Sequence, residues 1–385
     1  MNKTIEKMET AQEIVSLTWL FKESTRTPDI VRETEKIYRG LGVPVLYGVL
    51  SILANKSVFF IGGRGLGKTR VIKSIPYLPD APTSKWDTFT LGELSAFCGK
   101  HEEPNDIGVR NSNFVFKVGD FSTFSEYHRE IFLTVCSKII SDGEYIHITE
   151  MTPHLSFEDC RLTMLIAIQP KLYSLLCNRY TQWESMAYDR FTKFLLINPL
   201  RQGKTVDTPF LPTLPRKIPP SATISDNIDL TCLISLFGNQ VSEGRAQLYA
   251  RDYAIAMARF QGKESVDQSD VNTFYKLFSP YLDTFSKLQH RETLEEAIMV
   301  SSGHMEVLTE IGKHLEGIVK SQLSTSLKVT EDHIGRCLSF LVEKGVARKE
   351  QDKYCLSTDL EQFFKWYRDT FSSEISASSS SAKGD

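Results

Sequence analysis

SVFFIGGRGLGKT, residues 57 to 69, is the stretch that decides the fold of this 385-residue chain. Val58 to Ile61 are all β-branched or aromatic, which predicts a short strand over Ser57 to Ile61. Gly62 to Thr69 match the pattern GxxxxGK[ST], and a helix is predicted to begin at Lys68. A strand, a glycine-rich loop and a helix in this order indicate a phosphate-binding loop. We therefore expect the chain to bind a nucleoside triphosphate, taken as ATP with Mg²⁺.

Each residue type in the loop has a chemical task. Glycines allow backbone N–H groups to curl around phosphate oxygens without Cβ clashes, and the start of the following helix adds partial positive charge. Lys68 supplies a cation for the β- and γ-phosphates, and the Thr69 hydroxyl can ligate Mg²⁺. The expected nucleotide-binding residues are Gly62, Gly63, Arg64, Gly65, Leu66, Gly67, Lys68 and Thr69.

Composition narrows the class of protein that carries this loop. Apolar residues make up 41% and charged residues 24%, with a formal net charge of −3. These values are typical of a globular protein and exclude a chain that is polycationic along its whole length. The seven cysteines form no CxxC pair, which indicates reduced thiols. Neither an apolar signal segment nor a membrane-spanning apolar run occurs, so we expect a cytoplasmic protein without a membrane partner.

Around the loop, predicted strands alternate with predicted helices. This alternation predicts an α/β fold in which helices flank a parallel sheet over residues 41–205. Besides the strand before the loop, strands are expected at 114–118, 145–148, 162–168 and 194–197.

Other segments flank this core. A polar helical segment over 1–40 precedes it, and five prolines within 200–222 indicate a linker after it. Helical patterns fill the rest of 206–301, and residues 302–371 form a separate C-terminal module. The Ser-rich tail over 372–385 is expected to be disordered.

Over about residues 40–300 the chain resembles an AAA+ ATPase of the MoxR-like or MCM-like branch. The resemblance implies an all-α lid over 206–301 and a second strand ending in Asp-Glu, where Asp orders Mg²⁺ and Glu activates water. Here the strand ends in Gly119-Asp120, followed by Phe121. Either Asp120 stands for the Asp and Phe121 replaces the Glu, or Gly119 replaces the Asp and Asp120 stands for the Glu. Asp120 is thus the candidate catalytic carboxylate and metal ligand, or else a helix N-cap, and hydrolysis is expected to be slow.

Three further residues take roles from the same resemblance. Gln169, in IAIQP, is similar to the sensor that faces the γ-phosphate, or else it satisfies the backbone at a strand end. Arg190, in the run Asp189-Arg190-Phe191, resembles an arginine that reaches a neighbouring subunit's nucleotide, which implies a ring, commonly a hexamer. Arg245 resembles the lid arginine that contacts the γ-phosphate. The alternatives are a local Asp189–Arg190 pair and a solvated arginine.

The C-terminal module resembles a winged helix. Such modules often place their third helix in the DNA major groove. Over 304–358, however, eight Lys/Arg balance eight Asp/Glu, and strong DNA binders usually concentrate positive charge. DNA contact and protein docking both stay open. The expected elements are helices at 304–315, 322–327 and 330–344 and strands at 346–348 and 353–356.

Three functional hypotheses follow from these features. The first is a ring-forming ATPase that acts on DNA or a DNA-bound complex, as a loader, initiator or regulator. The second is a protein-remodelling or assembly ATPase whose C-terminal module docks a protein client. The third is a scaffold that is switched by bound ATP and hydrolyses it weakly.

Overall fold

A five-stranded parallel sheet forms the centre of the computed structural model, which confirms the expected α/β fold. Its strand order is β2-β4-β7-β1-β8. The bounds are β1 Ser57–Ile61, β2 Thr83–Trp86, β4 Asn113–Val118, β7 Arg161–Ile168 and β8 Phe191–Leu195. The structure describes residues 28–38, 40–63, 65–78, 81, 83–87, 90, 93–94, 96, 109–110, 113–149, 152–179, 189–196, 210–289, 302–314, 316–357 and 360–361. The tail over 372–385, Arg64 and most of 1–40 lie outside these residues.

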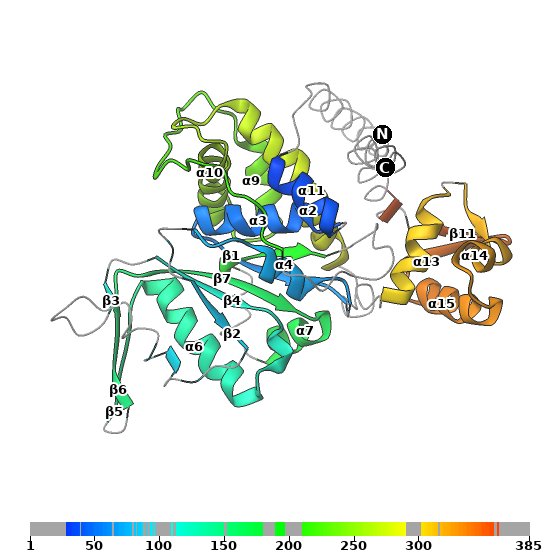
Figure 1. Ribbon diagram of the computed structural model, residues 1–385, viewed down its shortest axis with the longest axis horizontal. Helices are drawn as coiled ribbons and strands as arrows, with labels where there is room; N and C mark the ends of the chain where they lie inside the picture. Colours follow the sequence, from blue (N-terminus) through cyan, green and yellow to red (C-terminus); the bar gives the residue numbers. More distant parts are fainter. Residues whose placement is uncertain are drawn as a thin grey trace, which may run out of the picture.

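Helices cover both faces of the sheet. Figure 1 shows α6 and α7 on one side and α3, with α9, α10 and α11, on the other. All twelve residues of α3 are buried, which fits its apolar sequence. The bounds are α2 Asp29–Ile37, α3 Gly42–Leu53, α4 Lys68–Ser74, α6 Glu126–Asp142, α7 Pro170–Arg179, α9 Thr231–Gly238, α10 Glu243–Phe260 and α11 Gln268–Gln289.

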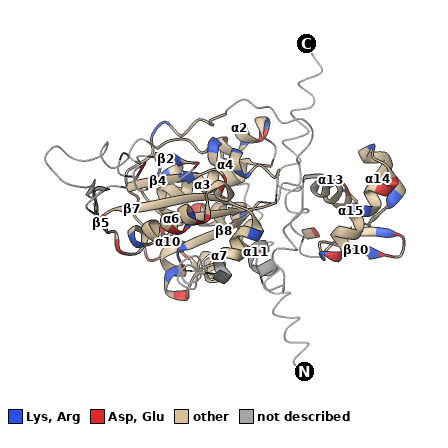
Figure 2. Ribbon diagram, turned by 90° about the horizontal axis from the view of Figure 1, so that it is seen from below, with Lys and Arg blue, Asp and Glu red and all other residues tan. Residues whose placement is uncertain are grey.

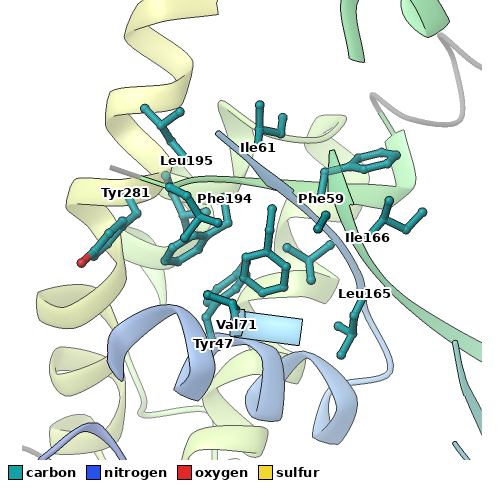
Figure 3. Packing of buried hydrophobic residues seen from close by; sticks show 14 of the residues in the cluster. Tyr47, Phe59, Ile61, Val71, Leu165, Ile166, Phe194, Leu195 and Tyr281 are labelled. Carbon is teal, nitrogen blue, oxygen red and sulfur yellow. The ribbon is translucent and has the colours of Figure 1, made fainter. Parts of the chain in front are cut away.

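Aromatic side chains join the sheet to α3 and α11 (Figure 3). Tyr47 of α3 lies 4.7 Å from Phe194 of β8, and Phe194 stacks at 4.6 Å on Tyr281 of α11, measured between ring centroids. Tyr47 also stacks on Tyr253 of α10 at 5.4 Å. Helices from residues beyond 230 therefore share one apolar core with the sheet.

A buried lysine strengthens the same junction. Lys193 of β8 is 1% exposed, and its Nζ donates to the backbone oxygen of Gln240 just after α9. Gln240 in turn accepts from the backbone N–H of Lys193 and donates to the oxygen of Leu282 in α11. Because a buried ammonium is costly without partners, these bonds fix β8, α9 and α11 together.

A second buried lysine, on β4, holds the helix that follows the glycine-rich loop. Lys117 is 1% exposed and donates to the backbone oxygen of Ile75, the C-cap of α4. Burial and the nearby Lys85 ammonium lower the pKa of Lys117 to about 7. A neutral amine still donates, so this bond does not depend on the charge.

Two smaller three-stranded sheets, one mixed and one antiparallel, complete the described fold. One contains β3 (Val109–Arg110), β5 (Tyr145–Thr149) and β6 (Thr152–Glu158), with β3 running parallel to β6. The other, at the C-terminus, has the strand order β10-β11-β9. Its elements are α13 Ser302–Gly312, β9 Ile318–Val319, α14 Lys320–Leu327, α15 Glu331–Glu343, β10 Ala347–Glu350 and β11 Lys353–Leu356. Across the described part of the chain, no helix is both long and apolar enough to cross a membrane.

Candidate nucleotide site

The glycine-rich loop leaves the carboxyl end of β1 in the middle of the sheet. β1 lies between β7 and β8, and the N–H of Gly62 donates to the oxygen of Ile168 at 3.3 Å. Gly65 and Gly67 have φ of +77° and +92°, the left-handed region that favours glycine. A Cβ on Gly67 would also lie 3.0 Å from the Leu41 side chain. The backbone therefore needs glycine at both positions.

The side chain of Lys68, the first residue of α4, folds back into the glycine-rich loop. Its side chain is 7% exposed, and Nζ donates to the backbone oxygen of Gly63 at 2.7 Å. This places an ammonium next to the curled backbone, where the phosphates of a nucleotide would sit. The position fits a cation that neutralises phosphate charge.

Thr69 connects the loop to β4. Its Oγ1 donates to the backbone oxygen of Gly119 at 2.9 Å. A hydroxyl has one proton and two lone pairs, so a hydroxyl whose proton is bonded keeps its lone pairs for a cation. Thr69 therefore fits the expected role of a Mg²⁺ ligand.

Asp120 lies at the same edge of the sheet, directly after Gly119. Its Oδ1 accepts from the N–H of Ser122 at 3.0 Å and from the Ser122 hydroxyl at 2.6 Å. Asp120 is thus the N-cap of the short 3₁₀ helix Phe121–Thr123, which confirms the N-cap interpretation. One of its carboxylate oxygens is already engaged in this cap.

Gln169 is brought next to the loop by the parallel pairing of β7 with β1. It follows Ile168, whose Cα pairs with that of Ile61 and whose oxygen accepts from Gly62. Gln169 is partly buried, and its backbone oxygen accepts from the N–H of Tyr173 at the start of α7. The carboxyl edge of the sheet therefore gathers Lys68, Thr69, Asp120 and Gln169.

Arg190 and Arg245 lie at the opposite edge of the sheet. Arg190 directly precedes β8, whose first residue pairs with Ser57 at the start of β1. Five residues of β1 separate this edge from the loop, roughly 16 Å at the usual rise per strand residue. Arg190 Nη1 donates to the oxygen of Ile140 at 3.1 Å.

Asp189 forms an ion pair with Arg245, and Arg190 lies near both of these charges. Arg245 Nε lies 2.8 Å from Asp189 Oδ2, and Ser242 donates to the other oxygen of Asp189. Burial, with the nearby guanidinium of Arg245 as the next cause, lowers the pKa of Arg190. The local Asp189–Arg190 pair that the sequence left open is therefore replaced by an Asp189–Arg245 pair.

Arg245, to which the family resemblance gives contact with the γ-phosphate, lies at the sheet edge opposite the loop of its own chain. The first turn of α10 is held beside Asp189, before β8, rather than beside Gly62 after β1. Tyr249, four residues further along α10, fixes this arrangement by donating to the oxygen of Arg190 at 2.6 Å. Only the tertiary packing of α10 could show which edge Arg245 faces.

A cavity of about 1130 Å³ opens between these arginines. It lies along the amino ends of β1 and β7 and the side of α10. Lys56 enters it and pairs with Asp252 at 2.6 Å. The charged residues that line it are Lys56, Arg161, Arg190, Arg245, Arg259, Asp142, Asp159 and Asp252.

Two residues near the site have roles that the sequence alone did not suggest. Tyr249 donates a hydrogen bond to the backbone oxygen of Arg190. Its position four residues after Arg245 on one helix could have indicated that the two side chains share a face. The backbone oxygen of Gly119 accepts a hydrogen bond from the Thr69 hydroxyl, and no side chain at position 119 indicates this contact in the sequence. Comparison of the sequence with protein-family models and with curated proteins found no match.

Proposed function

We propose that this protein binds ATP with Mg²⁺ through Gly62–Thr69 and is an AAA+-type ATPase with slow turnover. The observation that carries this proposal is the arrangement of Lys68 and Thr69 in a loop whose backbone requires glycine at positions 65 and 67. Such a loop offers phosphate its N–H groups and one buried cation.

The remaining residues at this edge supply supporting roles. Asp120 holds or orients water near the cation with the carboxylate oxygen that does not cap Ser122. Gln169, beside the loop, orients the γ-phosphate through its amide. The Thr69 oxygen would hold Mg²⁺, which neutralises charge that develops on the phosphates. Phe121 follows Asp120 in place of the second carboxylate that the family resemblance implies, which favours weak activation of water and slow hydrolysis.

A calorimetric titration of the full-length protein with ATP in Mg²⁺ tests the proposal. We expect one site per chain, with an affinity that competing pyrophosphate lowers because the phosphates carry recognition. Absence of binding at millimolar ATP would remove the proposal.

We further propose that the protein assembles into a ring in which Arg190 and Arg245 reach ATP held by the neighbouring subunit. Both guanidiniums lie far from their own chain's loop and beside a large cavity with several cationic residues. Arginine suits this task because it stays charged and binds phosphate oxygens through two N–H groups. ATP would then link two copies of the chain, and the family resemblance suggests a hexamer.

Sedimentation velocity with ATP and Mg²⁺ checks this assembly. The wild type is expected to form a larger species with ATP than without it, and Arg245→Ala is expected to reduce that species severalfold. Arg251→Ala is the matched control, because Arg251 is an exposed arginine on the same helix and does not line the cavity. Equal loss in both variants, or no ATP-dependent species, would contradict the role of the pair.

For the C-terminal module we propose a winged helix that docks a protein client, the alternative being DNA. Figure 2 shows basic and acidic residues interspersed over α14, α15 and β10. The exposed face of α15 carries Glu331, Asp332 and Glu343 against Arg336. Phosphate contacts need concentrated positive charge, which this face does not offer.

The hairpin of this module also has part of its positive charge neutralised. Arg348 lies 2.7 Å from Glu350 and 3.6 Å from Glu361, measured between nitrogen and oxygen. Lys349 and Lys353 are exposed. In fluorescence anisotropy with duplex DNA, we expect weak binding that Lys349→Glu leaves within about twofold. Tight binding that this substitution weakens would instead favour DNA as the partner.

A further inference from the structure

A second cavity lies at the amino ends of the strands, at the sheet edge opposite the glycine-rich loop. Its volume is about 450 Å³, which is within the range of small-molecule sites. It is bounded by the end of α3, the chain between α4 and β2, the first residue of β4 and residues 214–218, here called the linker wall. None of the described residues that line it belongs to Gly62–Thr69, so a ligand here would leave the nucleotide site open.

Most of the described residues that line this cavity are apolar. The buried ones are Ile52, Leu53, Leu78 and Ala81. Leu214 and Ile218 of the linker wall pack against the same core and are half-buried. The ring of Tyr77 is 48% exposed beside them. Together these side chains offer a surface that an apolar part of a ligand would cover favourably.

The charged side chains of this cavity have one sign. They are Arg216, Lys217 and Arg259, and no Asp or Glu is among the described residues that line it. Arg216 and Lys217 are exposed, and no ion pair joins either of them to a carboxylate of the described chain. The larger cavity beside Arg190 differs, because three aspartates accompany its cations. The smaller cavity therefore favours a ligand with negative charge.

Hydrogen bonds hold the linker wall from both sides. Before it, the N–H of Thr213 donates to Glu33 of α2 at 2.9 Å. After it, Arg259 of α10 donates from Nε to the backbone oxygen of Pro219 at 2.8 Å and from Nη1 to that of Leu53 at 3.0 Å. The protein's own contacts thus position the wall, so binding of a ligand does not have to order it.

We propose that this cavity binds a small organic anion with an apolar body. The apolar body would cover the buried side chains between α3 and β2, and a carboxylate or phosphate group would lie at Arg216 and Lys217. Inorganic phosphate would leave the apolar lining uncovered, and a neutral apolar molecule would make no use of the cations. The site is separate from the glycine-rich loop, so this inference does not depend on ATP binding.

Calorimetric titration of the full-length protein with naphthyl phosphate tests the proposal. We expect saturable binding with a dissociation constant below about 1 mM. Naphthylmethanol, which lacks the charge, should bind about tenfold more weakly or worse, and Arg216→Glu should weaken binding of naphthyl phosphate by a similar factor. Lys68→Ala should leave the affinity within about twofold, because Lys68 belongs to the glycine-rich loop and not to this cavity.

Arg251→Glu is the matched control, since Arg251 is an exposed arginine of α10 that does not line the cavity. Its affinity should stay close to that of the wild type. Equal losses in Arg216→Glu and Arg251→Glu, equal affinities for the two probes, or no saturable binding at millimolar concentration would overturn the inference. Binding that Lys68→Ala removes would also overturn it, because the probe would then lie in the glycine-rich loop. Circular dichroism checks the fold of each variant, and the two probes on the wild type still decide the inference if Arg216→Glu does not fold.

Discussion

Lys68→Ala is expected to weaken ATP binding by about tenfold to a hundredfold, the cost of losing hydrogen bonds from a charged donor to phosphate. The ammonium of Lys68 lies inside the loop, bonded to Gly63 O, and is 7% exposed. A cation in so enclosed a position acts on phosphate with little screening by water. Calorimetric titration with ATP and Mg²⁺ measures the effect directly.

Lys73→Ala is the matched control for this experiment. Lys73 lies in the last turn of the same helix, α4, and is exposed. Its removal changes the net charge of the protein equally but leaves the loop intact, so ATP affinity should change by less than about twofold. Equal affinity losses in the two variants would mean that ATP senses net charge rather than the loop.

Phe59→Ala is expected to lower the free energy of unfolding by about 3–5 kcal/mol, the range for buried phenylalanine. Phe59 is in the middle of β1, is 0% exposed, and stacks on Phe191 of β8 at 4.5 Å between ring centroids. Tyr173 of α7 meets it edge-on at 5.5 Å. Its loss opens a cavity between β1, β8 and α7. β1 is the strand that leads into the glycine-rich loop.

Urea unfolding followed by circular dichroism measures this change. Leu175→Ala on α7 is the comparison, since Leu175 is 45% exposed and its truncation should cost less than about 1 kcal/mol. A loss below about 1 kcal/mol in Phe59→Ala would show that the core around β1 is not packed as the structure has it.

Elements that depend on residues adjacent in sequence were predicted correctly. β1 was predicted at Ser57–Ile61 and is observed there, since its apolar run ends at a run of glycines. The helix predicted over 330–344 is observed as α15, and the side chain of Thr330 caps it by accepting a hydrogen bond from the N–H of His333. Capping chemistry and glycine punctuation depend on neighbours in sequence, so a single sequence contains them.

Other features depend on partners distant in sequence. β2 at Thr83–Trp86 was missed because it is a polar edge strand of four residues that parallel pairing with β4 stabilises. β8 begins at Phe191, three residues before the predicted start, because Thr192 and Lys193 are buried polar residues that pair with β1. Burial supplied by tertiary partners overrides local propensity at such positions.

In the candidate site, too, the contiguous motif was predicted and the contacts between residues distant in sequence were not. The motif from Gly62 to Thr69 is contiguous and was found in full, although Arg64 lies outside the described residues. The bond from Thr69 to Gly119 spans fifty residues, and the pairing of Arg245 with Asp189 spans fifty-six. Such contacts follow from the order of strands in the sheet, which the sequence pattern did not determine.

A crystal structure of the full-length chain with a non-hydrolysable ATP analogue and Mg²⁺ tests the central claim most directly. We expect the triphosphate within the loop Gly62–Thr69, with the γ-phosphate bonded to Lys68 Nζ and the cation on Thr69 Oγ1. An analogue bound at another place in the chain, or a loop that stays without it at saturating concentration, would contradict the account.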